Sequence, residues 1–422
     1  MFDKIKSILG NKKILILGFG KEGKSTLSFI LDFISVREIT VADANDVSLQ
    51  LPDGVKCKCG NGYISGLDEY DVIIKSPGIV LNEEAKKYLG KITSQTDLFL
   101  KEFRDFTIGI TGTKGKSTTT TLIHHVLETA GKDAVLTGNI GIPPLDSARK
   151  MKENSIAVFE MSCHQLEYQL VSPHIALVLN LFEDHLDHYG TREKYVEAKE
   201  NIFLHQNKND VLIINEDCRE QIKKAPSTVI TVGERDFFEI PKKDISLVGE
   251  HNYYNIRSAR LITDIFGVSD EDFIKGLITY KPLPHRLQYV ATKNGVEYYD
   301  DSISTVCQTT IQAINALENV ETVIIGGMDR GIDYTELADF LKVHTLKNII
   351  LIHESGDRIA GLLDERGVSY KKADDLKSAV ELSAKVTSSG AKCVMSPAAA
   401  SYGYFKNFEE RGDVFQTIVN NL

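Results

Sequence analysis

The sequence lacks any apolar run approaching the roughly 20 residues that a membrane-spanning helix needs, which argues against a membrane protein. The first residues, Met1–Lys6, lack the apolar core of a signal peptide, so we expect a cytoplasmic protein. The net charge is −10, and acidic and basic residues are interspersed, which argues against nucleic acid as the main partner. Hydrophobic content of 42% and charged content of 26% are typical of a soluble globular enzyme.

Cysteines are also few and scattered, with six in the chain. Only Cys57 and Cys59 lie close together, and no second Cys or His pair follows at the spacing of a zinc site. We therefore interpret this pair as part of a strand and not of a metal site. In a reducing compartment the other cysteines are expected to be small core residues.

The length of 422 residues is too great for one ordinary core and predicts two to three domains. Strands alternate with helices throughout, so the predicted fold class is α/β, and we favour three domains. These are a Rossmann-like N-terminal domain (1–103), a central P-loop-type ATP-binding domain with a mostly parallel sheet (104–292), and a C-terminal Rossmann-like domain (293–422).

A phosphate-binding loop is predicted where a β-branched strand, a glycine turn and the start of a helix follow one another. Gly112 and Gly115 permit backbone angles that let main-chain amides face an anion, and the helix dipole adds positive potential. Lys116 would then neutralise the β- and γ-phosphates. The hydroxyl of Ser117 or Thr118 would hold Mg²⁺.

A glycine fingerprint near the N-terminus predicts a second diphosphate site. The buried strand 12–17 runs into Gly-Phe-Gly-Lys-Glu-Gly at 18–23, and a later strand ends in Asp43, where a ribose hydroxyl or base edge is often held. The turn Ser76–Gly78 follows a third strand at the same sheet edge. The glycines alone are weak evidence for NAD, because such a loop recognises a diphosphate and not a nicotinamide.

Carboxylates and imidazoles follow two strands of the central region. Glu160 ends one strand, and the stretch 183–188, which contains His185, follows another, so both are expected at the edge that carries the phosphate loop. Such groups near nucleotide phosphates suit Mg²⁺ or Mn²⁺. Lys199 lies on the next helix, and its spacing alone indicates a solvated surface charge.

Three further groups are candidates for ligand contacts. Asn252 and Asn255 open a long helix and can hydrogen-bond a base, and Arg286 follows a rigid Pro-Leu-Pro segment as a plausible phosphate contact. The segments 326–330 and 396–412 lie beyond strand ends of the third domain, where a second substrate would meet the nucleotide.

Together these motifs resemble the Mur ligase family along essentially the whole chain. The residues that carry the resemblance are 112–118, 139–141, 160–167, 183–185, 198–199, 251–255, 284–286, 301–302 and 396–412. The closing Ser-Pro-Ala-Ala-Ala-Ser and Phe-Lys-Asn-Phe-Glu-Glu-Arg-Gly are similar to those of the glutamate-adding members. The resemblance implies an ATP-dependent ligase that adds glutamate to UDP-N-acetylmuramoyl-L-alanine through an acyl phosphate, as a monomer, in peptidoglycan precursor synthesis.

The resemblance also implies residue roles. Catalytic roles fall on Lys116, Glu160, His185 and Lys199, the last as a lysine carbamylated by CO₂. Two Mg²⁺ (or Mn²⁺) sites would use Ser117, Glu160, His185 and Lys199. ATP would contact Gly112, Thr113, Lys114, Gly115, Lys116, Ser117, Thr118, Asn252, Asn255, Arg286 and Asp301. The UDP substrate and the amino acid would contact Gly20, Lys21, Glu22, Asp43, Ser76, Pro77, Gly78, Asn139, Ser162, Arg330, Ser401, Tyr402 and Phe408.

One departure from the family pattern concerns the amino acid. Ile303 and Val306 stand in Asp-Ser-Ile-Ser-Thr-Val where D-glutamate-adding members commonly have Asp-Ser-Lys-Ala-Thr-Asn, so an ammonium expected near glutamate is absent. An L-glutamate-adding variant is therefore an alternative, and our hypothesis is that Arg330 and main-chain donors near Ser401 bind the side-chain carboxylate.

Three competing functions are compatible with parts of the sequence. A folylpolyglutamate-synthase-like ligase shares the chemistry, but the domain of about 100 residues before the phosphate loop weighs against it. An NAD(P)-dependent oxidoreductase would explain the N-terminal glycines but not the ATP loop. A nucleotide-gated binding protein without turnover is disfavoured by the combined presence of Glu160, His185 and Lys199.

Overall fold

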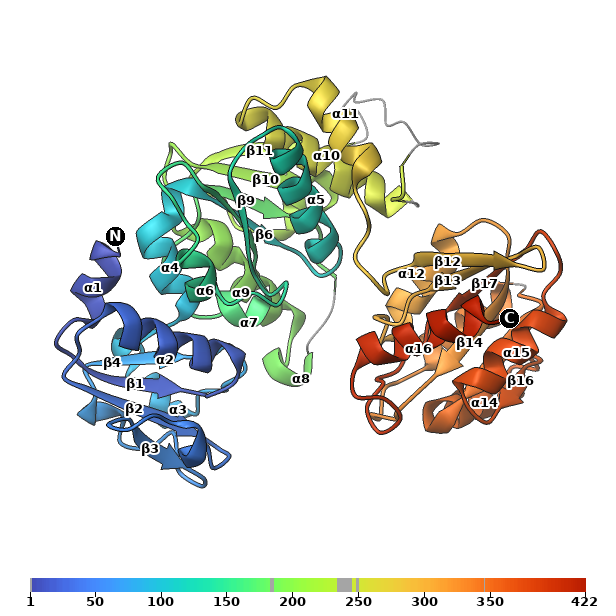
Figure 1. Ribbon diagram of the computed structural model, residues 1–422, viewed down its shortest axis with the longest axis horizontal. Coiled ribbons are helices and arrows are strands. Elements are labelled where there is room, and N and C mark those ends of the chain that lie inside the picture. Colours follow the sequence, from blue (N-terminus) through green and yellow to red (C-terminus); the bar gives the residue numbers. More distant parts are fainter. Residues whose placement is uncertain (1, 183–185, 234–244, 248–249, 345) are drawn as a thin grey trace. The chain divides into compact units, whose positions relative to one another are not determined.

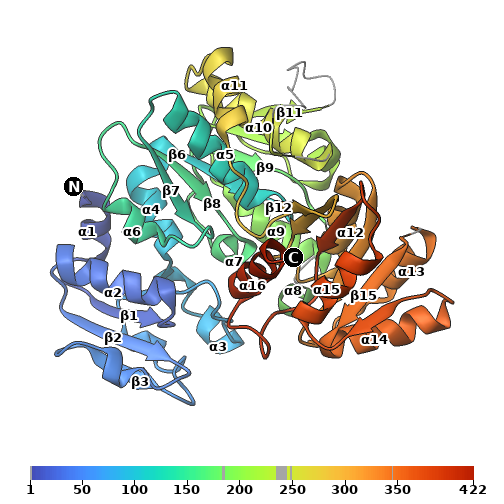
Figure 2. The same cartoon turned by 45° about the vertical axis from the view of Figure 1, so that its right-hand side comes forward.

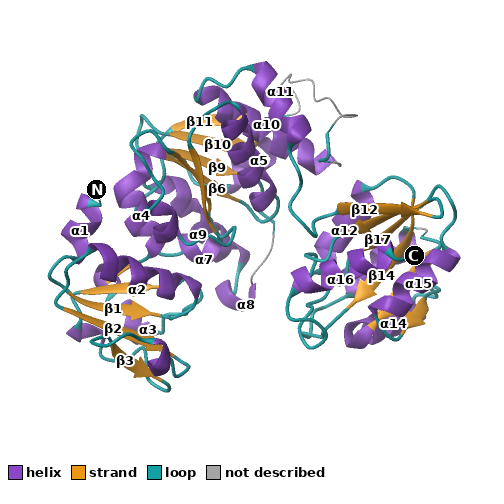
Figure 3. Ribbon diagram, in the orientation of Figure 1, coloured by secondary structure: helices purple, strands orange, loops and turns teal. Residues whose placement is uncertain are grey.

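Figure 1 shows the computed structural model of the chain, which describes residues 2–182, 186–233, 245–247, 250–344 and 346–422. The chain forms two compact units, one of Met1–Ile245 and His251–Tyr280, the other of Ser246–Glu250 and Lys281–Leu422. Strands and helices alternate in both units, which confirms the predicted α/β class (Figure 3). Among the described helices, none combines the length and apolar character that a membrane span requires.

The first sheet of unit 1 is parallel and has the strand order β3-β2-β1-β4-β5. Its strands are β1 (Lys13–Leu17), β2 (Glu38–Asp43), β3 (Lys56–Cys59), β4 (Val72–Lys75) and β5 (Ile92–Thr93). The strand order reverses between β1 and β4. The loops that follow these two strands, at Gly18 and Ser76, therefore open at a topological switch point, where doubly wound sheets bind ligands. The Rossmann-like topology predicted for this region is thus observed.

Helices join the first sheet to the second through one apolar core. The helices of this region are α1 (Asp3–Leu9), α2 (Lys21–Phe33), α3 (Glu83–Lys86) and α4 (Gln95–Phe103). Phe99 of α4 packs edge-on against Phe159 of the next sheet, with ring centroids 5.5 Å apart. This continuous core explains why the predicted first and second domains form one compact unit.

The second sheet is also parallel, with the order β11-β10-β9-β6-β8-β7. Its strands are β6 (Thr107–Thr111), β7 (Ala134–Gly138), β8 (Ile156–Glu160), β9 (Ile175–Val178), β10 (Val211–Asn215) and β11 (Thr228–Val232). Figure 2 brings β7 and β8 into view beside β6. Because β6 lies between β8 and β9, the loop after β6 is flanked by the ends of both neighbouring strands.

The helices around the second sheet include the one that follows the phosphate loop. They are α5 (Lys116–Thr129), α6 (Pro144–Ala148), α7 (Cys163–Leu166), α8 (Leu186–Tyr189), α9 (Arg192–Leu204), α10 (Glu250–Ile265) and α11 (Asp270–Thr279). Helix α11 packs closely on α5, since a Cβ added to Gly276 would lie 2.9 Å from Cγ2 of Val126.

The third sheet makes up the core of unit 2, in the order β12-β13-β17-β14-β15-β16. Its strands are β12 (Gln288–Lys293), β13 (Val296–Asp300), β14 (Val320–Gly326), β15 (Asn348–Ile352), β16 (Lys371–Ala373) and β17 (Lys392–Met395). Its helices are α12 (Cys307–Ala316), α13 (Thr335–Val343), α14 (His353–Glu365), α15 (Leu376–Val386) and α16 (Phe408–Asn420). Only the β12–β13 pair is antiparallel among these described strands.

The third sheet begins with a hairpin of β12 and β13, which starts before the boundary expected at 293. Asn294 and Gly295 form its turn with positive φ angles of 51° and 79°. Since β12 pairs with β13, the third sheet begins at Gln288, and the main segment of unit 2 is Lys281–Leu422. Position 293 is the last residue of β12 and lies within the hairpin.

Candidate functional site

The phosphate loop has the geometry that the sequence predicts. Gly115 caps the N-terminus of the 14-residue helix α5 in the left-handed conformation, at φ 82°. The Lys116 ammonium folds back over the loop and donates to the carbonyls of Gly112 (2.9 Å) and Thr113 (3.0 Å). A glycine loop at the start of a helix presents amides and the positive end of the helix dipole to an anion.

Asn180 holds this loop in place, a role that its sequence pattern does not assign to it. Its Oδ1 accepts from the Lys114 amide at 2.7 Å, and its Nδ2 donates to the Lys114 carbonyl at 3.0 Å. Its own carbonyl accepts from the Thr113 amide at 2.9 Å. Strand β9 ends at Val178, and Asn180 bonds to the loop instead of to the sheet. A polar residue directly after a buried strand was the available signal.

Lys199 is buried, so its interpretation as a surface charge is wrong. Its side chain is on α9 and is only 2% exposed. Its Nζ donates to the Gly112 carbonyl at 2.9 Å and to Thr111 Oγ1 at 3.4 Å. Two ammonium groups, those of Lys199 and Lys116, thus share one carbonyl acceptor. Two like charges this close in a buried site repel, so a modification that removes one of them would relieve the repulsion.

Glu160, the last residue of β8, lies beside the loop, and only one of its two carboxylate oxygens has a hydrogen-bond partner among the described residues. It is 1% exposed, and its Oε1 accepts from Nδ2 of Asn139 at 2.7 Å. Its Oε2 is buried and has no hydrogen-bond partner among the described residues. A buried carboxylate oxygen without a partner is costly unless it binds something, and a hard cation fits it. Ser117, the other predicted oxygen ligand, lies in the first turn of α5, and His185 lies outside the described residues.

Asn255 contacts the opposite side of the phosphate loop. A Cβ added to Gly115 would lie 2.8 Å from Asn255 Oδ1, so the amide packs directly on the glycine. Asn255 Nδ2 donates to Asn252 Oδ1 at 3.0 Å, and both side chains are buried in α10. The two asparagines predicted to contact a nucleotide therefore lie next to the predicted phosphate site.

The switch point of the first sheet gathers the residues predicted to bind the UDP moiety. Asp43 Oδ2 accepts from the Phe19 amide at 2.8 Å, and Ser76 Oγ donates to the Gly18 carbonyl at 2.9 Å. Burial alone would raise the pKa of Asp43, but hydrogen bonds from the Phe19 and Asn45 amides hold the pKa below its usual value. The turn that continues from Ser76 through Pro77 to Gly78 follows β4 at this edge.

Contacts between the first and second sheets bring the glycine loop to the central region. The Lys21 ammonium donates to the Gly141 carbonyl. Gln165 Nε2 donates to Glu22 Oε1 at 2.9 Å. Gln165 also completes a capping box with Ser162, the N-cap of α7. Residues predicted to bind one substrate, Lys21, Glu22 and Ser162, are thereby linked across the two sheets.

Glu22 is an unusual residue for a diphosphate loop because it carries a carboxylate. It is the second residue of α2, whose N-cap is Gly20. Its Oε2 is buried without a hydrogen-bond partner among the described residues. Burial raises the pKa of Glu22 to about 7, although the Gln165 amide and the charge of Lys75 act in the opposite direction. Near neutral pH this group is therefore partly protonated.

Asp301 is a buried acid of unit 2 and follows Asp300, which is also buried. Its Oδ2 accepts from Ser396 Oγ at 2.7 Å, and its Oδ1 accepts from the Leu287 amide at 3.1 Å. Burial raises the pKa of Asp301 to about 6, while hydroxyl hydrogen bonds and the charge of Arg286 oppose this shift. The Arg286 Nε is buried without a partner among the described residues.

The residues predicted to meet the amino acid lie on loops at one edge of the third sheet. Arg330 follows β14 and is exposed, and Ser401 and Tyr402 follow β17, with Tyr402 57% exposed. Since β14 and β17 are parallel neighbours, these loops start side by side. Phe408 begins α16 and is half-buried.

The closing Arg-Gly motif has a packing role that its sequence does not indicate. Arg411 is buried and donates to Ser302 Oγ (3.0 Å), the Ser302 carbonyl (2.8 Å) and the Ala399 carbonyl (3.0 Å). A Cβ added to Gly412 would lie 2.0 Å from His285 Nδ1. The motif therefore fixes the turn after β13 and the loop after β17.

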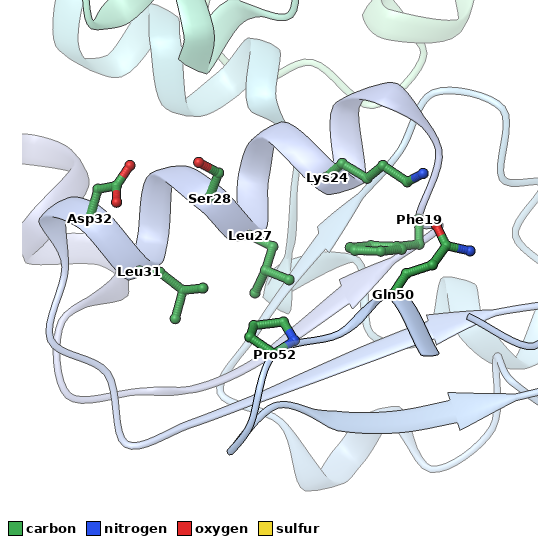
Figure 4. Close-up of a pocket in the computed structure, with 8 residues that line it drawn as sticks. All are labelled: Phe19, Lys24, Leu27, Ser28, Leu31, Asp32, Gln50 and Pro52. Carbon is green, nitrogen blue, oxygen red and sulfur yellow. The ribbon is translucent and has the colours of Figure 1, made fainter. Parts of the chain in front are cut away.

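A separate cavity of about 430 Å³ lies on the first sheet, between α2 and the segment Gln50–Pro52. Figure 4 shows Phe19, Leu27 and Leu31 facing it, with Lys24 at one end. Phe19 belongs to the glycine loop 18–23, but none of the side chains predicted to contact the UDP substrate lines the cavity, which therefore lies outside the candidate site. Within unit 1 the predicted residues form contacts with one another, and those of unit 2 gather at their own sheet edge.

Comparison with known proteins gives a consistent result. Residues 110–263 match the model of the Mur ligase middle domain. The chain is 33% identical over 445 residues to a UDP-N-acetylmuramoylalanine–D-glutamate ligase of Geobacillus kaustophilus (strain HTA426), covering 98% of each chain. It is 31% identical to the protein of the same name from Bacillus subtilis (strain 168), again over 98% of each chain.

The fold is likewise similar to that of solved structures. A MurF ligase from Thermotoga maritima in complex with ADP superposes with a TM-score of 0.61 at 18% sequence identity. The match covers 99% of this chain and 97% of the other. At this level of identity the similarity concerns the fold.

Proposed function

The chain belongs to the Mur ligase family, and on that premise we propose that it joins D-glutamate to UDP-N-acetylmuramoyl-L-alanine with consumption of ATP. The chain aligns over nearly its full length with relatives named UDP-N-acetylmuramoylalanine–D-glutamate ligase, which supports an enzyme of peptidoglycan precursor synthesis. The observation that carries the proposal in this chain is the phosphate loop, where Lys116 and Lys199 meet at the Gly112 carbonyl. The family assignment also replaces the hypothesis of an oxidoreductase.

The chemistry requires activation of a carboxylate, because an amide does not form spontaneously from a carboxylate and an amine in water. The L-alanyl carboxylate attacks the γ-phosphate of ATP, and an acyl phosphate and ADP result. The glutamate amine then attacks the acyl carbon, and the tetrahedral intermediate expels phosphate. Lys116 and the amides at the start of α5 stabilise the charge on the phosphoryl group that is transferred.

The residues around the loop fit a divalent cation. Ser117 and Glu160 offer the oxygen ligands that Mg²⁺ prefers, and the buried Oε2 of Glu160 has no partner among the described residues. His185 and a carbamylated Lys199 would complete two sites. When bound, the cations neutralise charge on the phosphates.

Carbamylation of Lys199 is part of the proposal. It would replace one of the two ammonium groups at Gly112 by an anion, which suits a cation site and removes a repulsion. A carbonyl ¹³C NMR signal in the carbamate range, after incubation with ¹³C-bicarbonate, tests it without reference to activity. The signal should be absent in Lys199→Met. It should be present in the control Lys101→Met, which removes a different lysine, on α4. A signal that survives Lys199→Met would assign the carbamate elsewhere.

We also propose that the substrate sites are distributed over three domains, 1–103, 104–292 and 293–422. The sheet of the third domain starts earlier, at Gln288. The UDP substrate contacts Gly20, Lys21, Glu22, Asp43, Ser76, Pro77, Gly78, Asn139 and Ser162. ATP contacts residues 112–118, Asn252, Asn255, Arg286 and Asp301. Glutamate contacts Arg330, Ser401, Tyr402 and Phe408. We propose that the enzyme acts in the cytoplasm as a monomer.

The test is phosphate release from ATP with UDP-N-acetylmuramoyl-L-alanine and D-glutamate, L-glutamate or no amino acid. We expect turnover with D-glutamate alone, which would show that Ile303 replaces the usual lysine without loss of function. Turnover with L-glutamate alone would assign the chain to the L-glutamate-adding variant. Lys116→Ala should abolish ADP release, whereas Lys152→Ala, at an exposed position, should not; retained turnover in Lys116→Ala would refute the role of the loop.

A further inference from the structure

Cys57 and Cys59 form a disulfide on the edge of the first sheet. Both lie on β3, the outermost strand, and residues two apart on a strand point to the same face. Their Cα atoms are 6.0 Å apart, and Cys57 is exposed. The pair is therefore accessible to small thiols and disulfides in solution.

This disulfide is not explained as a structural staple. It links residues separated by two positions, and a bridge that closes so short a loop restricts the unfolded chain little. The other four cysteines, Cys163, Cys218, Cys307 and Cys393, are free and buried. Cys57 and Cys59 thus differ from the rest of the chain's cysteines in both exposure and pairing.

The pair is directly connected to the edge where the UDP substrate is proposed to bind. In the register of β2 and β3, Cys59 pairs with Asp43, and the Gly60 amide donates to the Asp43 carbonyl at 3.0 Å. A carboxylate oxygen of Asp46 and the two sulfur atoms all lie within 4.8 Å of one another. Asp46 also accepts from the Ser48 amide at 3.0 Å. The segment 43–48 is therefore anchored next to the sulfur atoms.

The two redox states offer Asp46 different partners. A thiol can donate a weak hydrogen bond to a carboxylate, whereas a disulfide sulfur has no hydrogen to donate. Reduction thus supplies a hydrogen-bond donor on β3 within 4.8 Å of the Asp46 carboxylate, and oxidation removes this donor. Since Asp43 begins this segment, the change reaches the proposed nucleotide site.

We propose that Cys57 and Cys59 form a redox switch that weakens binding of the UDP substrate when oxidised. The inference rests on the proposed function of the N-terminal domain. The oxidant is a low-molecular-weight disulfide: a Cys thiolate attacks one of its sulfurs and expels a thiolate, and the second Cys resolves the mixed disulfide and expels another. Two protein thiols lose two electrons and two protons, and the small disulfide becomes two thiols.

The test compares full-length enzyme equilibrated in reduced and oxidised glutathione. Alkylation and mass spectrometry count the free thiols in the peptide that contains residues 57–59. In the oxidised enzyme we expect the KM for the UDP substrate to rise about threefold or more with kcat unchanged, as expected for loss of a weak contact to a charged group. Amide hydrogen exchange in 43–48 should be faster after oxidation.

Matched variants separate this switch from other thiol effects. The double substitution Cys57→Ser, Cys59→Ser keeps a donor for Asp46 and should behave as the reduced enzyme in both buffers. Cys218→Ser, at a buried free cysteine, should keep the response to oxidation.

Two kinds of result would overturn the switch. The first is that the KM for the UDP substrate and the amide hydrogen exchange of 43–48 are equal in the reduced and oxidised enzyme. The second is that Cys57 and Cys59 stay reduced in oxidised glutathione, which includes the case in which a tightly bound zinc ion protects them from oxidation. Absence of ligase activity in both states would instead count against the proposed function. Calorimetric affinity for the UDP substrate and hydrogen exchange would then still decide the switch.

Discussion

Glu22 should make the stability of unit 1 depend on pH. Its pKa is raised by burial to about 7, against 4.5 for an ordinary Glu side chain. Because the folded-state pKa is the higher one, the unfolded chain releases the proton first, and the folded state loses stability as pH rises from about 4.5 to about 7. A difference of about 2.5 pKa units corresponds to about 3 kcal/mol over the full window.

The assay is thermal unfolding by calorimetry at about pH 5 and about pH 8, with wild type compared to Glu22→Gln. Glutamine resembles the protonated acid and keeps an acceptor for Gln165, which donates to Glu22 Oε1 at 2.9 Å. Wild type should lose about 2 kcal/mol more than the variant between these pH values, which is a few degrees in Tm for a unit of this size.

The comparison between variants removes the titration of all other groups, which is common to both proteins. Glu84→Gln, at an exposed carboxylate of α3, is the matched control and should follow wild type. Parallel curves for wild type and Glu22→Gln would refute the reasoning. They would mean that water or a rearrangement solvates the Glu22 carboxylate and that it ionises normally.

Three further predictions concern single contacts. Gly115→Ala should raise the KM for ATP about tenfold or more, because its Cβ would lie 2.8 Å from Asn255 Oδ1 at a φ of 82°; an unchanged KM measured by phosphate release would contradict the predicted loop geometry. Arg411→Met should lower the free energy of unfolding of unit 2 by about 3 kcal/mol in calorimetry, because three acceptors lose a buried donor. The control Arg358→Met removes a partly exposed ion pair and should cost about 1 kcal/mol or less. Arg330→Ala should raise the KM for glutamate while the KM for ATP stays unchanged, and an unaltered KM for glutamate would disprove the assignment.

Strand positions were largely predictable because buried parallel strands are apolar and bounded by polar residues. The predictions that one strand ends at Asp43 and another at Glu160 match the observed ends of β2 and β8. The prediction that Cys57 and Cys59 lie on a strand is confirmed by β3, Lys56–Cys59, but the bounds of this strand were not predictable. Two of its four residues are lysines, and as an edge strand it needs little apolar surface, so its pattern carries no burial signal.

The conformation of the loop 112–116 was predictable because it depends on local sequence, whereas contacts from residues distant in sequence were not predictable. Gly112, Gly115 and Lys116 are adjacent in sequence, and their loop has the expected conformation. Lys199 reaches the same loop from a helix more than 80 residues away, so spacing could not show that it is buried. Only the resemblance to a known family indicated its importance.

Three carboxylates lie at or just after the ends of strands, and the environment gives each a different chemistry. Asp43, the last residue of β2, accepts hydrogen bonds from two backbone amides, which hold its pKa below the usual value. Asp301, just after β13, is so buried that its pKa rises to about 6, and its oxygens are taken by Ser396 and a backbone amide.

Glu160, the last residue of β8, has one hydrogen-bonded carboxylate oxygen and one buried oxygen that has no partner among the described residues. Of the three carboxylates it therefore has the strongest structural reason to bind a cation, since binding would remove the cost of an unpaired buried oxygen. The ammonium groups of Lys116 and Lys199, which share the Gly112 carbonyl, place positive charge near this carboxylate. The net charge at this edge of the sheet therefore depends on whether Lys199 stays a cation. A pattern of strands that end in acids locates candidate sites, whereas the hydrogen bonds around each acid determine which of them can hold a metal ion.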